Sequence, residues 1–485
     1  MSGLAHWLEQ ARARVALDDD DGGERAYLEA LKIDGANFEA LNDLGVLAHR
    51  RGRRTAARLT HQRALRFHPE SAIAHVNLAN ILSEEEDPAA RDHYRTALAI
   101  DPTFAAAHKG LARFYEREGD GRAEAHWRLG GGEAVSLRPR RGVGPAIPVL
   151  LIVSAKLGNM PIDPWLDDRL FEAAIVEIEY VAEAAPVPPH AAAINLIGDA
   201  DLCGEALAKA ERWMKAPVLN PPARVAATGR LDNARRLGAL PGVITPEMRE
   251  LRRPELAPAA LAFPLLLRAP GFHAGRHFTR VDRREELCAA LAELPGDTLL
   301  AMSCLDARGP DGLSRKYRVM SIDGRLYPLH LAISSDWKVH YFSAAMAEDS
   351  GRRDEERRFL DEPEAVLGPV AWGALAAIQQ EVGLDYFGVD FALSPEGALL
   401  LFEANAAMAM LDPPPDPLWD YRRPALAAAR AAAREMVMRR ARGAPFSRLR
   451  EKVAEGRMRV VRLPRPHPSP LPQAGEGAYP GDFRP

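Results

Sequence analysis

The sequence predicts a multidomain protein with an all-α helical-repeat solenoid, followed by an α/β domain and an α+β domain. The chain has 485 residues, which is too many for one hydrophobic core. At about 150 residues per domain, this length suggests roughly three domains. The first part shows helical apolar spacing that recurs with the regular period of a repeat protein. The middle part alternates strand-like and helix-like segments, and the part from about residue 248 has longer strands joined by hairpin turns.

The composition excludes several classes of protein. Hydrophobic residues make up 47% and charged residues 27%, and the formal net charge is -4, so we expect neither nucleic acid nor an anionic membrane as a partner. The three cysteines (Cys203, Cys288 and Cys304) form no CxxC pair, which disfavours a disulfide framework or a thiolate metal site and fits a cytoplasmic protein. Every apolar run is far shorter than about 20 residues, so we expect no membrane span.

Small residues recur in register over positions 1–130. Aligning "YLEALKID" (27–34), "HQRALRFH" (61–68) and "YRTALAID" (94–101) superposes two sets of them, Ala30, Ala64 and Ala97 and then Gly45, Ala79 and Ala112. Each unit is therefore expected to be a helix pair that buries its apolar face by stacking on its neighbours. The pattern resembles the tetratricopeptide repeat (TPR) family, which implies a groove for a peptide or protein. Ordinary helical hairpins without a groove are the alternative.

The remaining segments follow from local composition. Glycine, proline and basic residues predict a linker over 131–146. An α/β domain is expected over 147–247 and an α+β domain over 248–442. In the former we expect strands in 147–159, 177–184 and 191–201 and a helix at 203–215. An Ala/Arg-rich helix is expected at 421–442, and the proline-rich tail at 463–485 is expected to be disordered.

The stretch "YFGVDFALSPEGALLLFEAN" (386–405) predicts a two-stranded hairpin with polar residues at Asp390, Glu403 and Asn405. If "SPEG" (394–397) closes the hairpin with an even-numbered loop, Asp390 faces Leu401 and the three polar residues share one face. Phe402 then belongs to the apolar underside. Two neighbouring carboxylates repel unless a cation lies between them, and Mg²⁺ prefers hard oxygen ligands. The alternative is a solvated, exposed sheet face.

This hairpin resembles the closing strands of ATP-grasp enzymes, in which an Asp on one strand and a Glu-x-Asn on the next hold magnesium ions bound to ATP phosphates. The resemblance implies that Asp390, Glu403 and Asn405 are metal ligands, although "AAMAM" (406–410) replaces the Pro and Gly that often follow. It also implies a pre-ATP-grasp domain over 147–247 and an ATP-grasp domain over 248–442.

Basic residues that precede the hairpin in the sequence fit a nucleotide-phosphate site. Arg268 ends an apolar strand, and Gly271 and Gly275 open a loop whose backbone N–H groups can approach phosphate oxygens. The family usually has a Lys where Arg268 stands. Segment 298–312 occupies the place of the family's adenine-binding hinge.

A second basic element is "SRKYRVMSIDGR" (314–325), whose Asp-Gly turn predicts a hairpin with Lys316 and Arg318 on one face. The resemblance implies that Arg318 faces the phosphate and the acyl intermediate. Lys316 is the second catalytic candidate and also a nucleotide contact. His330, Lys338 and His340 are candidates to hold an acidic substrate, although packed or solvated histidines are the plainer interpretation.

The predicted function is that of an ATP- and Mg²⁺-dependent ligase. It would activate a small-molecule or peptide carboxylate as an acylphosphate for attack by an amine or thiol, while the repeats recruit a peptide or protein partner. Two alternatives stay open. One is a nucleotide-binding TPR scaffold without turnover, and the other is an ATP-dependent small-molecule kinase, because a fold does not settle a reaction.

Overall fold

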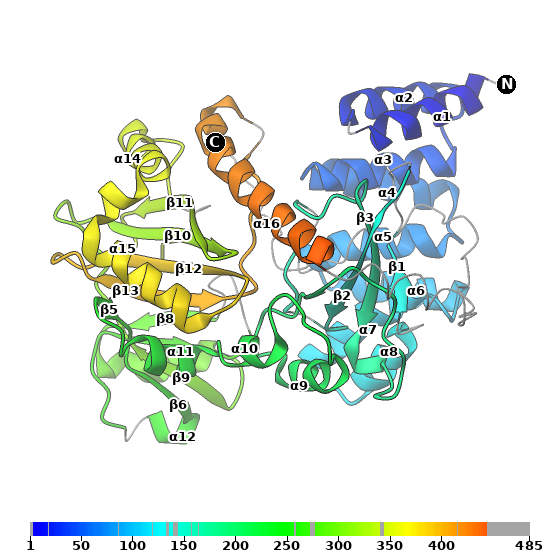
Figure 1. Ribbon diagram of the computed structural model, residues 1–485. Helices are drawn as coiled ribbons and strands as arrows, with labels where there is room; N and C mark the ends of the chain where they lie inside the picture. The colour runs from blue at the N-terminus through cyan, green and yellow to red at the C-terminus, as the bar shows by residue number, and fades with distance from the viewer. Residues whose placement is uncertain are drawn as a thin grey trace. The chain divides into compact units, whose positions relative to one another are not determined.

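The protein is described by a computed structural model. It covers residues 3–17, 19–85, 87–118, 120–131, 135–138, 144–156, 158–162, 164–256, 259–271, 277–339, 344–414 and 416–443. Gly275, His340 and the tail at 463–485 lie outside the described residues. The described residues divide into two compact units, the first up to residue 131 and the second from residue 135 to residue 443. Figure 1 labels most elements of both units.

The first unit is entirely helical in its described part. Its helices are α1 (Gly3–Ala16), α2 (Asp20–Ile33), α3 (Phe38–Arg50), α4 (Arg54–Phe67), α5 (Ala72–Glu84), α6 (Ala89–Ile100), α7 (Ala105–Arg117) and α8 (Arg122–Gly131). Each helix packs on the next one along the chain. This arrangement confirms the predicted helical repeats.

The small residues in register lie where these helices approach one another. Ala30, Ala64 and Ala97 are fully buried. Gly45 lies so close to the ring of His61 that a Cβ added to it would lie 2.6 Å from that ring. The period seen in the sequence is therefore a packing requirement, because a larger side chain at these positions would push the helices apart.

The second unit begins with a four-stranded sheet. Its strands are β1 (Val135–Leu137), β2 (Ile147–Val153), β3 (Phe171–Glu177) and β4 (Ala192–Asn195), in the order β1-β3-β2-β4. β2 pairs in parallel with β3 and β4, as expected of an α/β layer, and β1 is antiparallel to β3. Two expectations are wrong. No strand forms over the described residues 178–184: β3 lies earlier, ends at Glu177 and is followed by the 3₁₀ turn η1 (Ile178–Tyr180). The segment expected as a linker contributes β1.

Two further sheets follow. One has the order β6-β9-β7-β8 and the other the order β11-β10-β12-β13-β5. The strands are β5 (Val243–Ile244), β6 (Met248–Arg252), β7 (Leu265–Arg268), β8 (Phe278–Val281), β9 (Thr298–Ser303), β10 (Ser314–Ile322), β11 (Arg325–Ser334), β12 (Tyr386–Leu393) and β13 (Leu399–Asn405). Asp323 and Gly324 both have positive φ, which confirms the predicted two-residue hairpin turn between β10 and β11.

Helices cover these sheets. They are α9 (Gly204–Trp213), α10 (Pro222–Ala226), α11 (Arg230–Leu237), α12 (Arg253–Leu256), α13 (Leu287–Glu293), α14 (Ser350–Asp361), α15 (Pro363–Val382) and α16 (Arg423–Gly443), with 3₁₀ turns η2 (Arg284–Glu286) and η4 (Pro417–Arg422). α14 contacts β11 and α15 contacts β13 (Figure 1), and neither helix is among the predicted elements. α16 confirms the expected C-terminal helix, and its apolar side joins a core shared with the first sheet and β10.

The register of the β12–β13 hairpin differs from the predicted one. Leu393 pairs with Leu399 and Phe391 with Leu401, after which a β-bulge shifts the register so that Asp390 pairs with Glu403. The predicted pairing of Asp390 with Leu401 is therefore wrong. The bulge nevertheless brings the two carboxylates opposite each other, because the extra residue, Phe402, restores the shared face.

Among the described residues, no helix combines the length and the apolar character that crossing a membrane requires.

Candidate functional site

A cavity of about 550 Å³ lies between the two later sheets. Side chains from β7, β8 and β9 line one wall, and side chains from β10, β12 and β13 line the other. The segment after β9, the segment after β11, Arg230 of α11 and Met248 of β6 also contribute to the lining. Such a volume lies within the range of about 300–1,000 Å³ typical of small-molecule sites.

Basic side chains outnumber acidic ones among the described residues that line this cavity. The basic residues are Arg230, Arg268, Arg280, Arg308, Lys316, Arg318 and Lys338, and the acidic ones are Asp306, Asp336, Asp390 and Glu403. Apolar side chains such as Leu266, Met302 and Phe402 lie among them. The lining therefore suits a ligand that has both anionic and apolar parts.

Four titratable side chains form a row across the second sheet. His330 on β11 pairs with Arg318 on β10, Arg318 pairs with Asp390 on β12, and Asp390 pairs with Glu403 on β13. The bulge in β10–β11 begins directly after Arg318, and the bulge in β12–β13 begins directly at Asp390. Bulges re-aim side chains, and they are over-represented next to active sites.

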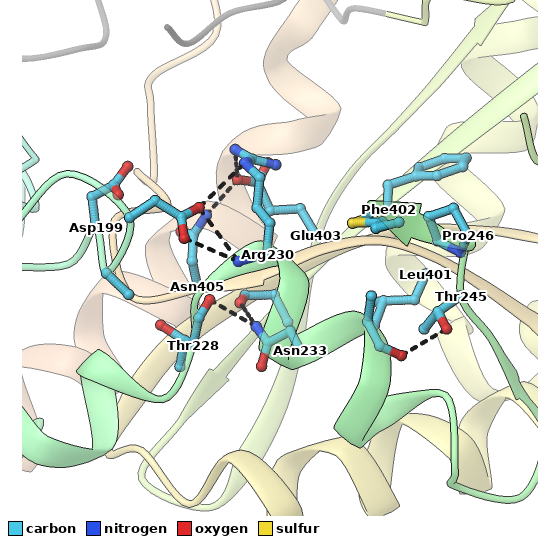
Figure 2. A pocket seen from close by; sticks show the side chains of 15 residues that line it. Asp199, Thr228, Arg230, Asn233, Thr245, Pro246, Leu401, Phe402, Glu403 and Asn405 are labelled. Atoms are coloured by element: carbon cyan, nitrogen blue, oxygen red, sulfur yellow. Dashed lines mark hydrogen bonds and ion pairs between the residues drawn. The ribbon is translucent and has the colours of Figure 1, made fainter. Parts of the chain in front are cut away.

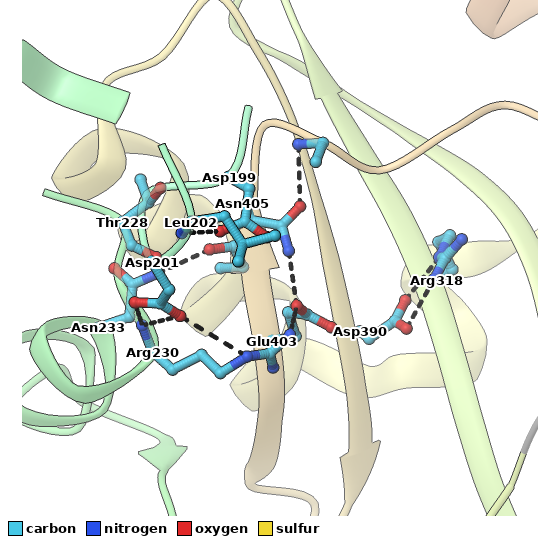
Figure 3. Close-up of polar contacts among 12 residues, drawn as sticks. Asp199, Asp201, Leu202, Thr228, Arg230, Asn233, Arg318, Asp390, Glu403 and Asn405 are labelled. Atoms are coloured by element: carbon cyan, nitrogen blue, oxygen red, sulfur yellow. Dashed lines mark hydrogen bonds and ion pairs between the residues drawn. The ribbon is translucent and has the colours of Figure 1, made fainter. Parts of the chain in front are cut away.

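Asp390 is neutralised by the two predicted cations. Its carboxylate accepts hydrogen bonds of 2.6 and 2.8 Å from Nε and Nη2 of Arg318, and Nζ of Lys316 lies 3.3 Å away. Only 4% of Asp390 is exposed. Burial would raise the pKa of Asp390, but the positive charges of Arg318 and Lys316 hold it well below its usual value. Lys316 and Arg318 thus share a face, as predicted. Figure 3 shows the Arg318–Asp390 pair beside Glu403.

Glu403 and Asn405 belong to a second polar cluster. Arg230 donates to the Glu403 carboxylate, and Nδ2 of Asn405 donates to the same carboxylate at 2.7 Å. Oδ1 of Asn405 accepts a hydrogen bond of 3.0 Å from the backbone N–H of Ala407. Figures 2 and 3 show Glu403 with Arg230 and Asn405, and the hydrogen bonds place Asn405 next to Glu403 rather than next to Asp390.

Arg230 is a site residue that the sequence analysis missed. It begins α11, pairs with Glu403 and with Asp201, and lines both the main cavity and a smaller one of about 30 Å³. Burial lowers the pKa of Arg230, yet the carboxylates of Glu403 and Asp201 raise it overall. No spacing in the sequence links Arg230 to a strand as far along the chain as β13, so only the tertiary fold identifies it.

A buried hydrogen bond fixes α11 against the metal-binding candidate strand. Nδ2 of Asn233 donates to the backbone carbonyl of Ala404 at 2.6 Å, and the Thr245 hydroxyl donates to the carbonyl of Ala234 at 2.8 Å. Figure 2 shows both contacts. Ala404 lies between Glu403 and Asn405, so this contact holds the backbone that carries both candidate ligands.

Arg268 and Lys338 approach the cavity from the other wall. Arg268 ends β7 as predicted, and its guanidinium lies 5.8 Å from the ring centre of Phe278. Burial, and then the charge of Arg230, lowers the pKa of Arg268 to about 10, so it stays protonated at neutral pH. Gly271 has the positive φ expected of a glycine loop, although it is not among the described residues that line the cavity.

A second cavity of about 70 Å³ adjoins the first. Lys316 and Arg318 line both cavities. Arg422 adds a third cation, Asp412 adds one carboxylate, His330 adds an imidazole, and Leu411 and Pro413 add apolar surface. Lys316 and Arg318 therefore stand between two spaces, and each space can take an anionic group.

The donor chemistry of the predicted trio fits Mg²⁺, because Asp390 and Glu403 occupy paired positions and offer hard oxygen ligands on one face of the sheet. Arg318 and Lys316 neutralise one carboxylate and Arg230 neutralises the other. Within the described part of the chain, no group of three or more His, Cys, Asp and Glu side chains is placed to hold a metal ion. The site is therefore a paired-carboxylate face with arginine counter-ions.

Phe402 lies on a different face of its strand from the one expected. Expected on the apolar underside, it lines the main cavity because it is the bulged residue between Leu401 and Glu403. Strict alternation along a strand cannot reveal such a residue, since a bulge breaks the alternation.

No family model matches the chain, and no curated protein matches it either. Among solved structures, a MamA protein is 24% identical, covers 27% of this chain and 72% of its own, and has a TM-score of 0.25. A tetratricopeptide repeat protein from Parabacteroides merdae is 21% identical over 27% of this chain and 52% of its own, also with a TM-score of 0.25.

The VanG D-Ala:D-Ser ligase from Enterococcus faecalis is 13% identical over 61% of this chain and 100% of its own, with a TM-score of 0.39. The solved structures similar to this chain thus include TPR proteins and a ligase. At these TM-scores none of the similarities carries an argument about the reaction, which has to be made from the residues themselves.

Proposed function

We propose that the second unit is an ATP- and Mg²⁺-dependent ligase that activates a carboxylate for attack by an amine or thiol. The observation that carries this proposal is the row Arg318–Asp390–Glu403, which faces a largely basic cavity of about 550 Å³. Paired carboxylates beside several buried cations suit a polyphosphate and its metal ion.

In this proposal the nucleotide occupies the main cavity. Arg268 and Lys338 face the phosphates from one wall, and Lys316 and Arg318 face them from the other. Leu266, Met302 and Phe402 offer the apolar contact that a base requires. Asp390 and Glu403, with Asn405, would hold Mg²⁺, which when bound neutralises phosphate charge and so assists the departure of ADP.

The carboxylate substrate occupies the cavity of about 70 Å³, where Arg422 adds positive charge beside Lys316 and Arg318. His330 also lines this cavity, and its lowered pKa leaves it uncharged at neutral pH. A substrate oxygen attacks the γ-phosphorus, and the bond to the ADP oxygen breaks. The amine or thiol then attacks the acyl carbon, phosphate leaves, and the nucleophile gives up its proton. Arg318 is positioned to balance charge on the phosphoryl group because it lines both cavities.

The side chains needed for this chemistry are cations and metal ligands, and no protein nucleophile takes part. For such a reaction the protein chiefly supplies alignment and charge neutralisation. The first unit would present a peptide or protein partner, as stacked helical repeats commonly do.

One observation favours a second candidate function, a nucleotide-binding TPR scaffold without turnover. Each candidate metal carboxylate is ion-paired to a basic side chain, Asp390 to Arg318 and Glu403 to Arg230. If these pairs persist when nucleotide binds, the carboxylates are unavailable to a metal ion. ATP would then bind through the cations alone.

Product analysis separates these functions and the small-molecule kinase. The chain is incubated with Mg²⁺-ATP, a panel of carboxylates and a panel of amines and thiols, and ADP, phosphate and organic products are quantified. The ligase releases ADP and phosphate in equal amounts with a coupled product. A kinase gives ADP with a stable phosphorylated product, and a scaffold gives neither. Absence of ADP release across the panels would overturn the ligase.

A further inference from the structure

Two pairs of histidines bridge helices in the first unit. Nδ1 of His75 on α5 lies 2.9 Å from Nδ1 of His93 on α6. Nδ1 of His108 on α7 lies 2.9 Å from Nδ1 of His126 on α8. Each pair therefore joins the two helices of one hairpin through the same ring atoms.

The two pairs are copies of one arrangement. His75 and His108 occupy the same position in successive repeats, and so do His93 and His126. The preceding hairpin, α3 and α4, has Leu41 and Thr60 in the corresponding register and so lacks the pair. The chain thus carries two equivalent histidine pairs and, in the same unit, a hairpin without one.

The second ring nitrogen of the first histidine is fixed in both copies. Nε2 of His75 lies 3.0 Å from the carbonyl of Pro69, and Nε2 of His108 lies 2.9 Å from the carbonyl of Pro102. A carbonyl only accepts, so Nε2 carries the proton and Nδ1 keeps its lone pair. Histidines that bind metals have this same outer contact, which orients the ring and sets the tautomer.

We propose that each pair is a two-histidine site for a divalent first-row transition metal such as Ni²⁺ or Zn²⁺, with water completing the coordination. Imidazole suits these ions. Two nitrogens at about 2.0–2.1 Å from a tetrahedral ion lie about 3.3 Å apart, so the present 2.9 Å separation needs only a small side-chain adjustment. On binding, the proton on Nδ1 of His93 moves through solvent to Nε2, which leaves both Nδ1 lone pairs on the metal.

The charges around the two sites differ. Burial and the charge of His75 lower the pKa of His93, whereas Asp92 and Asp87 act to raise it. At the second pair, burial, His108 and then Arg122 all lower the pKa of His126. A cation is favoured by nearby carboxylates and opposed by a guanidinium, so the His75–His93 site binds metal more tightly than the His108–His126 site.

Calorimetric titration of the full chain with Ni²⁺, after removal of metals with EDTA, tests this proposal. Wild type is compared with His93→Asn, His126→Asn and the double variant. Asn can still donate from Nδ2 near the place of Nδ1, so it retains the interhelical hydrogen bond but is a poor metal ligand. Each single variant should lose one binding event, and the remaining site in His126→Asn should be the tighter one.

His68→Asn is the matched control, because His68 contacts the carbonyl of Ala36 at 2.6 Å in the same unit but belongs to neither histidine pair. The double variant should lose the binding at both pairs, a fall at least as large as the roughly 10- to 100-fold that loss of an outer-shell partner costs. Binding in the double variant with the same stoichiometry and affinity as in wild type, or no binding in wild type, would overturn the proposal and leave two hydrogen-bonded histidine pairs. Broadening of the His93 and His126 ring signals by Ni²⁺ in wild type gives a readout that needs no variant.

Discussion

Arg318 and Asp390 occupy directly paired positions on β10 and β12 and share two hydrogen bonds of 2.6 and 2.8 Å. Both groups are largely removed from water, and Asp390 is only 4% exposed. Removing one partner of such a pair leaves a charge that is poorly compensated.

The first prediction follows from this pair. Arg318→Met should reduce the free energy of unfolding by about 3–5 kcal/mol, because Lys316 is then the one ion-pair partner of Asp390 among the described residues. The double variant Arg318→Met/Asp390→Leu should recover most of that loss, since it removes both charges. Urea unfolding of the three proteins measures this. A single variant within about 0.5 kcal/mol of wild type would show that the pair contributes little.

His330 should make the protein sensitive to acid. Burial, followed by the charges of Arg318 and Arg422, lowers the pKa of His330 well below 6.5, although Asp390 opposes this effect and Lys316 adds to it. The folded state therefore binds this proton less readily than the unfolded state. Neutral His330 therefore contributes to the free energy of unfolding above pH 6.5. This contribution is lost as the pH falls below 6.5, by at most about 1.4 kcal/mol per pH unit.

The variant His330→Gln should lack this part of the pH dependence. Unfolding free energies of both proteins, measured at a series of pH values from neutral to mildly acidic, give a difference curve. The curve should be flat above pH 6.5 and should change below it in favour of the variant. Parallel curves would mean that His330 accepts a proton equally well in both states.

Arg268 should distinguish nucleotides by their phosphates. Arg268→Met should weaken ATP binding by about 1.5–3 kcal/mol, the usual contribution of a hydrogen bond to a charged group. Adenosine binding should not change, because Arg268 is expected to contact phosphate only. Calorimetry with both ligands checks this, and Arg268→Lys should retain part of the ATP affinity. Equal losses of affinity for ATP and adenosine would show that Arg268 does not act through the phosphates.

Close helix contacts in the first unit should make two glycines sensitive to a single methyl group. A Cβ at Gly45 would lie 2.6 Å from the His61 ring, and one at Gly110 would lie 2.4 Å from the Tyr94 ring. Gly45→Ala and Gly110→Ala should each destabilise the unit by about 1–3 kcal/mol. Gly121→Ala is the matched control, because a Cβ there meets nothing within 4 Å. Thermal unfolding of the three variants measures this. Equal melting temperatures for all three would contradict the prediction.

Local pattern predicted the repeats and the strands β2, β4, β7, β10, β11, β12 and β13, because helix and strand periods depend on neighbouring residues. The Asp-Gly turn before Arg325 was predictable for the same reason, since a two-residue turn demands particular backbone angles. The sequence also indicated that Asp390 and Glu403 share a face, and the structure confirms this.

The register and the counter-ions were not predictable in this way. A β-bulge inserts Phe402 between Leu401 and Glu403, which pair with Phe391 and Asp390. The local sequence does not mark the position of this bulge. Arg230 reaches Glu403 only because α11 is fixed against β13 through Asn233 and Ala404. Contacts between segments so distant in sequence arise from packing of the whole unit. Residue spacing therefore cannot predict them.

The most direct test of the proposed site is the shift in melting temperature caused by ATP, with and without Mg²⁺, in wild type and in Glu403→Ala. Glu396→Ala is the matched control, since Glu396 lies in the exposed turn of the same hairpin. We expect a Mg²⁺-dependent shift in wild type and Glu396→Ala that is lost in Glu403→Ala. Equal Mg²⁺-dependent shifts in all three proteins would contradict this expectation.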